Sequence, residues 1–292
     1  MTIQNDPLAE KEEESGRKIF FSFSFFCPVS QRPCFRPWMA FFLLLVFSIP
    51  LPAAGYVLPG RLVLQLMLDN LNPPSAMAIT QNVTLYNKDG GVEKVFTEHA
   101  SYRPPACFRS ESDYRSERRI HVEAVRSAVT LINGRIVPPS ESISDAWMDL
   151  YKDIFCFRSP EGLADRLESS GLDVDVTSLG RFEDTVVYVI GDDYPRESAP
   201  QLWVYKDTFR PVRWIVISGA DSEDGMDRDI RYLSWRRVNN TWYPGRIEFY
   251  VGDQMVKAID VLHLDFDPGF PPGFFDVESI IANHAAGGST SK

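Results

Sequence analysis

The chain has 292 residues, of which 44% are hydrophobic, and a formal net charge of −10 at pH 7. A chain of this length can bury a large core without disulfides or metals, and its composition excludes a fully disordered protein. The first 55 residues carry five basic and five acidic side chains, so the net negative charge lies beyond Gly55. An acidic body argues against a nucleic-acid partner, because phosphates require a basic surface.

The N-terminal part has the order of a leader for export. Residues 1–16 are polar and acidic, as is typical of an unstructured tail. A segment with four basic residues and no acidic one follows, and then the apolar run 38–49 and the sequence PLPAAG at 50–55. This order is typical of a secretory signal peptide and predicts a periplasmic protein.

The fate of this leader has two interpretations. Small residues at Ala53 and Gly55 favour cleavage before Tyr56. The apolar run is shorter than the roughly 20 residues of a membrane-spanning helix, and the alternative is an uncleaved inner-membrane anchor. Met1 and Met39 are both candidate start residues.

Three parts are therefore predicted along the chain. Residues 1–55 form a disordered tail with a signal peptide or anchor, 56–280 form one folded domain, and 281–292 form a flexible C-terminal tail. The domain begins with a helix over 59–71, which ends before Asn72-Pro73-Pro74. Short strands separated by turn residues follow, which indicates a strongly curved antiparallel sheet. These strands are predicted at 77–86, 92–102, 107–110, 119–124 and 129–137.

Two helices are predicted to interrupt the sheet. Ser144 is a plausible N-cap for a helix to Phe155, whose apolar residues recur at helical spacing on one face. Ser159-Pro160-Glu161 is a typical helix start, and Gly171 is a typical stop.

The C-terminal part alternates apolar and polar residues with period two, which is the pattern of strands with one buried face. Over 262–267 the apolar residues are Leu262, Leu264 and Phe266. Near 259–262 the apolar residues shift from one set of alternate positions to the other, which predicts a β-bulge. Gly252-Asp253 predicts a tight hairpin turn.

Two segments carry a family resemblance. Residues 202–213 (LWVYKDTFRPVR) resemble the strand-turn-strand, and residues 241–249 (TWYPGRIEF) the following strand, of periplasmic lipoprotein carriers of the LolA and LolB type and their outer-membrane lipoprotein-sorting relatives. The resemblance covers roughly residues 58–280. It implies an α+β fold in which an unclosed β-barrel is covered by a helical lid and shelters acyl chains in an apolar hollow.

Candidate cavity residues are the apolar side chains of the predicted lid, of the first helix and of the long strands. For each of them, ordinary core packing is the alternative interpretation. They are Leu66, Met67, Trp147, Met148, Tyr151, Phe155, Trp203, Tyr205, Ile247, Phe249 and Val251.

Once the leader is removed, Cys107 and Cys156 are the remaining cysteines. An oxidising compartment would allow them to form a disulfide, and two unrelated buried thiols are the alternative.

Catalytic and metal motifs are missing from the sequence. There is no Gly-x-Ser-x-Gly, P-loop, Gly-x-Gly-x-x-Gly or His-Glu-x-x-His, so no enzyme, cofactor or metal is predicted. His121 with Glu123, and His263 with Asp265, are interpreted as surface pairs on strands. The acidic residues of 221–229 lack EF-hand spacing and are interpreted as a solvated turn.

The sequence thus predicts a periplasmic, monomeric protein that sequesters acyl chains of a lipid or lipoprotein, with envelope membrane proteins as further partners. The alternative is an envelope sensor or interaction domain that binds a protein partner with the same fold.

Overall fold

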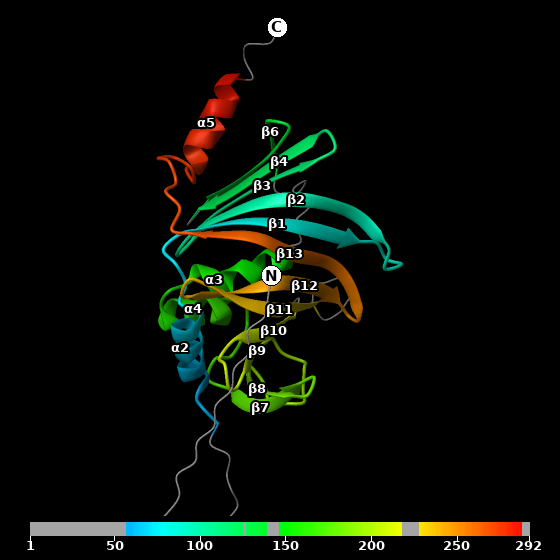
Figure 1. Ribbon diagram of the computed structural model, residues 1–292, viewed down its shortest axis with the longest axis vertical. Coiled ribbons are helices and arrows are strands. Elements are labelled where there is room, and N and C mark those ends of the chain that lie inside the picture. Colours follow the sequence, from blue (N-terminus) through cyan, green and yellow to red (C-terminus); the bar gives the residue numbers. More distant parts are fainter. Residues whose placement is uncertain (1–56, 125–126, 139–145, 218–227, 288–292) are drawn as a thin grey trace, which may run out of the picture. The chain divides into compact units, whose positions relative to one another are not determined.

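Thirteen strands among the described residues of this computed structural model form one antiparallel sheet (Figure 1). The structure describes residues 57–124, 127–138, 146–217 and 228–287. The first six strands are β1 (Met77–Tyr86), β2 (Val92–Arg103), β3 (Cys107–Tyr114), β4 (Glu117–Ala124), β5 (Ser127–Ile132) and β6 (Arg135–Val137). The other seven are β7 (Thr177–Phe182), β8 (Thr185–Ile190), β9 (Gln201–Tyr205), β10 (Pro211–Val216), β11 (Arg228–Val238), β12 (Thr241–Val251) and β13 (Gln254–Phe266).

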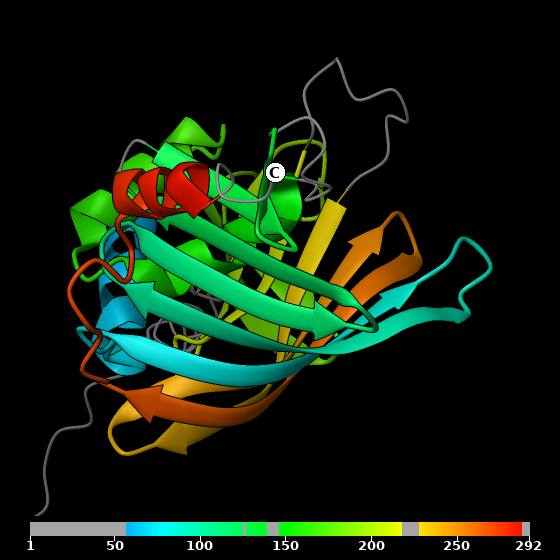
Figure 2. The same ribbon diagram turned by 90° about the horizontal axis from the view of Figure 1, so that it is seen from above.

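The strand order shows how the sheet is assembled. It runs β6-β5-β4-β3-β2-β1-β13-β12-β11-β10-β9-β8-β7, so two meanders are joined where β1 pairs with β13. Within the described residues β6 and β7 are the two ends of the sheet, which is therefore not closed. The predicted α+β fold with a curved, unclosed antiparallel sheet is confirmed, and Figure 2 shows the curvature of the strands.

Strand β1 illustrates how the sequence specifies two faces. Met77, Ile79, Gln81 and Val83 are buried, whereas the residues between them are only partly buried. Because successive side chains of a strand point to opposite faces, these four residues share one face. We call this the inner face of the sheet and the opposite one the outer face.

A β-bulge interrupts the pairing of β1 with β13. Thr80 pairs with His263 and Gln81 with Val261, which leaves Leu262 as an extra residue in β13. The predicted bulge is confirmed. The expectation that Leu262 shares the buried face with Leu264 was wrong: Leu262 is 53% exposed, because as the extra residue it falls outside the regular alternation of β13.

Four helical segments pack with the inner face. They are α2 (Gly60–Leu71), the 3-10 helix η1 (Ala146–Lys152), α3 (Asp153–Cys156) and α4 (Pro160–Ser169), and their buried side chains join those of the inner face in one hydrophobic core. The first predicted helix is confirmed by α2. These four segments cover the inner face, and the core lies between them and the sheet.

The two interrupting helices match the prediction to different degrees. Ser159 caps α4, since its hydroxyl accepts a hydrogen bond from Gly162 N at 3.0 Å, and Gly171 follows with φ of +87°. The other predicted helix is split: most of it is the 3-10 helix η1, and only α3 is α-helical. A short connector packed over a sheet commonly takes this tighter form. The predicted cap Ser144 lies outside the described residues.

The C-terminal segment packs elsewhere. Helix α5 (Val277–Gly287) contributes Val277 to a small core with Val122, Val129 and Leu131 of β4 and β5. Residues 281–287, which were predicted to lie in a flexible tail, belong to this helix. No described helix combines the length and hydropathy needed to cross a membrane. The predicted signal or anchor lies outside the described residues.

Candidate functional site

Most of the predicted cavity residues lie in the inner core. Met67, Trp147, Tyr151, Phe155, Ile247 and Phe249 are buried there, and Met148 and Val251 pack against the same core while half-buried. Leu66 is half-buried on α2. The aromatic members touch one another across the lid and the sheet.

Phe249 of β12 is the point where lid and sheet meet. Its ring centroid lies 5.9 Å from that of Trp147 and 5.7 Å from that of Tyr151, both in edge-to-face geometry. The ring centroid of Phe155 lies 4.6 Å from that of Tyr243, which belongs to β12 like Phe249. Such aromatic contacts add to the free energy gained from burial, so these residues form a filled core.

Trp203 and Tyr205 do not belong to this group. They lie in a separate cluster on the outer face of β9, whereas their neighbours Leu202 and Val204 point into the inner core. The expectation that they line the same cavity was wrong. All four consecutive residues are apolar, so the period-two pattern in β9 does not indicate which face is the inner one.

A cavity of about 270 Å³ lies between η1 and the inner face of β1 to β4 and β13. Of the predicted cavity residues, Met148 and Tyr151 line it. The rest of its wall comes from side chains that the sequence did not single out. They are Val83, Leu85, Tyr86, Glu93, Phe96, Glu98, Phe108, Ser110, Arg119, His121, Asp149, Val256 and Lys257.

The cavity wall is amphipathic rather than purely apolar. Cross-strand pairing places Val83 opposite Phe96 and Leu85 opposite Lys257, so apolar and charged positions alternate along the wall. Period-two alternation in β1 was the available signal for Val83 and Leu85. The charged positions gave no signal, because a charged residue in a strand normally faces water.

Buried polar groups at the inner end of the cavity form a hydrogen-bonded set. The Tyr102 and Tyr151 hydroxyls are 2.9 Å apart. Gln81 is fully buried, and its Nε2 donates a hydrogen bond to Glu98 Oε2 at 2.7 Å. Burial is the largest cause of the raised pKa of Tyr151, so its hydroxyl stays protonated at physiological pH.

His121 belongs to the cavity wall and not to a surface pair with Glu123. Its Nδ1 lies 2.9 Å from Thr130 Oγ1, and burial lowers the pKa of the imidazole. Glu123 instead forms an ion pair with Lys152, in which Nζ lies 3.0 Å from Glu123 Oε2. His121 and Glu123 do not pair, because Glu123 lies outside the cavity and is held by Lys152 of η1.

The other residues considered as metal ligands are His263, Asp265 and the acidic residues of 221–229. His263 and Asp265 are exposed, as predicted for a surface pair. Among the described residues no group of three or more His, Cys, Asp or Glu side chains is arranged to hold a metal ion. Residues 221–227 of the acidic stretch lie outside the described residues, and Asp229 is a buried member of β11.

Cys107 and Cys156 are free thiols in the structure, so the predicted disulfide is absent and the alternative of two unpaired thiols fits. Both line a second pocket, between the β2–β3 turn and α3. Burial raises the pKa of the Cys156 thiol, which keeps it protonated and unreactive.

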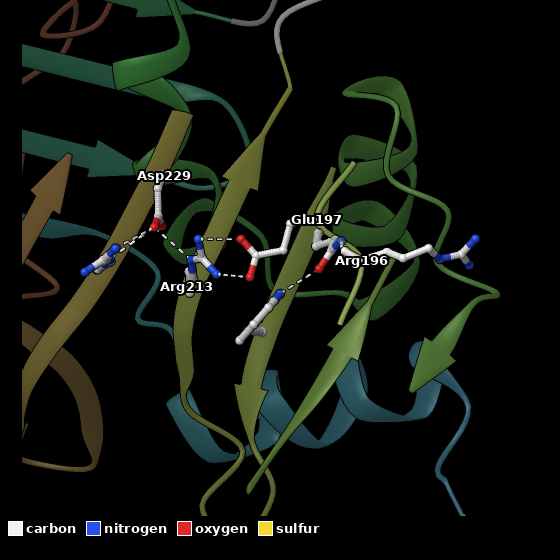
Figure 3. Close-up of polar contacts among 7 residues, drawn as sticks. Arg196, Glu197, Arg213 and Asp229 are labelled. Carbon is white, nitrogen blue, oxygen red and sulfur yellow. Dashed lines mark hydrogen bonds and ion pairs between the residues drawn. The ribbon is translucent and has the colours of Figure 1, made fainter. Parts of the chain in front are cut away.

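The outer face of β10 and β11 carries a network of paired charges (Figure 3). Arg213 donates two hydrogen bonds to the Glu197 carboxylate, at 2.7 and 2.9 Å, and a third from Nε to Asp229 Oδ2 at 2.8 Å. Arg231 Nε donates to the same Asp229 oxygen at 3.1 Å. The Arg213 guanidinium also lies 4.8 Å from the Trp203 ring centroid. Each charge here has a partner, which indicates a structural role for Trp203.

This charge pairing continues onto β12 and β13. Arg231 lies over the Tyr250 ring at 4.1 Å, and the Tyr250 hydroxyl donates to Glu248 at 2.8 Å. Arg246 donates hydrogen bonds to two carboxylates, from Nε to Glu248 Oε1 at 2.6 Å and from Nη1 to Asp260 Oδ1 at 2.7 Å. The outer face is therefore held by alternating charges across four strands.

Comparison with known proteins identifies the fold. No family model and no curated protein matches the sequence. A LolA superfamily protein from Nitrosomonas europaea has a similar structure, with a TM-score of 0.52 and 12% identity over 76% of this chain and 99% of that chain. An outer membrane lipoprotein-sorting protein domain from Vibrio parahaemolyticus gives a TM-score of 0.50 and 10% identity over 76% and 97%. The predicted resemblance is confirmed at the level of the fold, which is LolA-like.

Proposed function

We propose that this protein binds an acyl chain of a lipid or lipoprotein non-covalently in the cavity beneath η1 and carries it through the periplasm as a monomer. The cavity carries the proposal. Val83, Phe96 and Val256 offer apolar surface on its sheet side, and Met148 offers it on the lid side. The leader predicted at residues 1–55 supports export, and the LolA-like fold supports a binding role over a catalytic one.

The energetics of transfer favour such a site. Each methylene removed from water contributes about 0.8 kcal/mol, so even a partly enclosed acyl chain gains several kcal/mol. The volume of about 270 Å³ is close to the lower end of the range of about 300–1,000 Å³ for ligand pockets. A single chain therefore fits the site better than a multi-chain lipid.

The lid side of the cavity is suited to adjustment. Met148 is half-buried on the 3-10 helix, and a methionine adapts its shape to different ligands because it is unbranched. Chains of different length can then be accommodated by side-chain movement. Transfer to envelope membrane proteins would complete a sorting cycle.

Native mass spectrometry of the protein purified from the periplasm tests the proposal. Phe96→Asp places a charge in the cavity wall, and the matched control Val95→Asp places it on the neighbouring position of β2, where Val95 is 51% exposed. We expect co-purifying acylated species in the wild type and in Val95→Asp, and their loss in Phe96→Asp.

An empty wild-type protein with an intact circular dichroism spectrum would contradict the carrier function. That result would favour a sensor or interaction domain that binds a protein partner with the same fold.

A further inference from the structure

Lys257 places a cationic group inside the cavity. It lies on β13, paired with Phe249 of β12 on one side and Leu85 of β1 on the other, and is half-buried. Its Nζ is 4.9 Å from the Phe249 ring centroid and 5.9 Å from that of Tyr151. Among the described residues no carboxylate lies within the 4.0 Å of an ion pair with Nζ. Two aromatic rings of the described residues, Phe249 and Tyr151, thus lie beside this ammonium.

A second cation lines the same cavity. Arg119 of β4 is half-buried there and likewise forms no ion pair with a carboxylate of the described residues. Burial is the largest influence on the pKa of Lys257 and lowers it, Glu98 and Asp149 oppose this effect, and the positive charges of Arg119 and Lys152 add to it. Neither cation has a carboxylate of the described residues at ion-pair distance, so a bound anion could take that position beside them.

Three carboxylates, Glu93, Glu98 and Asp149, also line the cavity. Glu98 accepts a hydrogen bond from Gln81 at 2.7 Å, and Glu93 is exposed. Asp149 on η1 has interactions of its own and acts on Lys257 only at longer range, as does Glu98. These carboxylates moderate the positive field around Lys257 without occupying the position beside Nζ.

We propose that Lys257, with Arg119 as a second cation, binds the anionic head of a single-chain amphiphile whose alkyl chain lies against Val83, Phe96 and Val256. The inference rests on the proposed function and specifies its ligand class, a long-chain carboxylate or another acyl compound with one anionic head. Hydrogen bonds between an ammonium and an anion are about twice as strong as neutral ones, and they strengthen away from water. The cavity would thus select by charge as well as by chain.

Competitive displacement of a fluorescent fatty acid from the full, delipidated chain tests this inference. The ligands are dodecanoate, neutral dodecanol and, as a head group without a chain, acetate. We expect the wild type to prefer dodecanoate over dodecanol and to ignore acetate. Lys257→Met should weaken dodecanoate binding about 10-fold or more and leave dodecanol unchanged, because a charge-assisted hydrogen bond is lost.

Two variants control for charge and fold. Lys257→Arg keeps the cation and should retain the preference for dodecanoate. Lys206→Met makes the same charge change at an exposed turn position and should behave as the wild type. Urea unfolding confirms that each variant is folded.

The outcomes separate the inference from the function on which it rests. Equal binding of dodecanoate and dodecanol by the wild type, or an unchanged preference in Lys257→Met, overturns the head-group site and leaves the carrier function standing. Displacement by acetate alone replaces it with a simple anion site. If neither amphiphile binds the wild type, both proposals fail.

Discussion

The inner and outer faces of the same sheet are stabilised by different means. The inner face buries Ile247 and Phe249 against four helical segments, whereas the outer face of the same strand carries Arg246, Glu248 and Tyr250 in paired contacts. Alternate residues of one strand therefore belong to an apolar core and to a charge network. We expect ligand binding on the inner face, because the cavity beneath η1 lies there.

The two faces also differ in whether their charged side chains have close ion-pair partners. On the outer face Arg213 Nε donates a hydrogen bond to Asp229 Oδ2 at 2.8 Å. On the inner face Lys257 contacts aromatic rings and has no such partner among the described residues. A network of ion pairs stabilises the fold, whereas a half-buried cation without a close carboxylate costs stability, and the proposed anionic ligand would offset that cost.

The largest effect is expected from the inner core. Phe249→Ala removes a fully buried ring that contacts Trp147 and Tyr151, so unfolding in urea should show a loss of about 3–5 kcal/mol. The matched control Leu262→Ala alters an exposed bulge residue and should change stability by less than about 0.5 kcal/mol. Equal effects of the two substitutions would contradict the assignment of the two faces.

A smaller effect is expected from the outer network. Arg213→Met leaves Asp229 with Arg231 as its cation and leaves Glu197 partly exposed, so we expect a loss of about 1–3 kcal/mol in the same assay. Arg61→Met removes an exposed arginine that is paired with Glu168 and should show no measurable change. If both arginines prove neutral, the outer face does not depend on its charges.

His121 should make stability depend on pH. Burial lowers its pKa below the ordinary 6.5, against the opposing effect of Asp149 and with the help of Arg119 and Lys152. The unfolded chain then binds the proton more readily, so this contribution to stability is present above pH 6.5 and is lost as the pH falls below it. His121→Gln should flatten the dependence of stability on pH between about pH 7 and about pH 5 in urea titrations. An unchanged slope of stability against pH would indicate that the His121 ring is exposed to solvent.

The smallest effect on stability is expected at Lys257. Lys257→Met removes a cation that burial disfavours, so the midpoint of thermal unfolding should stay constant or rise while binding of an anionic amphiphile falls. A clear decrease in the midpoint would show that Lys257 is a structural residue. The comparison of Lys257 with Arg213 thus distinguishes charges used for binding from charges used for folding.

The sequence specified the strands and turns well, because they depend on local chemistry. Period-two alternation, the Ser159 cap and the parity change before Leu262 are all properties of short segments. The direction of Trp203 depended on which face the helices cover, and a run that is apolar on both faces carries no such information. Lys257 was missed because a lysine in a strand normally indicates the wet face, and only long-range packing shows that it points inward.

The junction of β1 and β13 bears on how the chain folds. At its end, Ser75 N donates to Asp267 Oδ1 at 2.9 Å across 192 residues of chain, so the sheet becomes continuous only when its first and last strands meet. Contacts of such sequence separation are slow to form because a long loop must close first. During synthesis, the N-terminal meander would therefore have an unpaired β1 edge until β13 is made, and an unpaired strand edge favours aggregation.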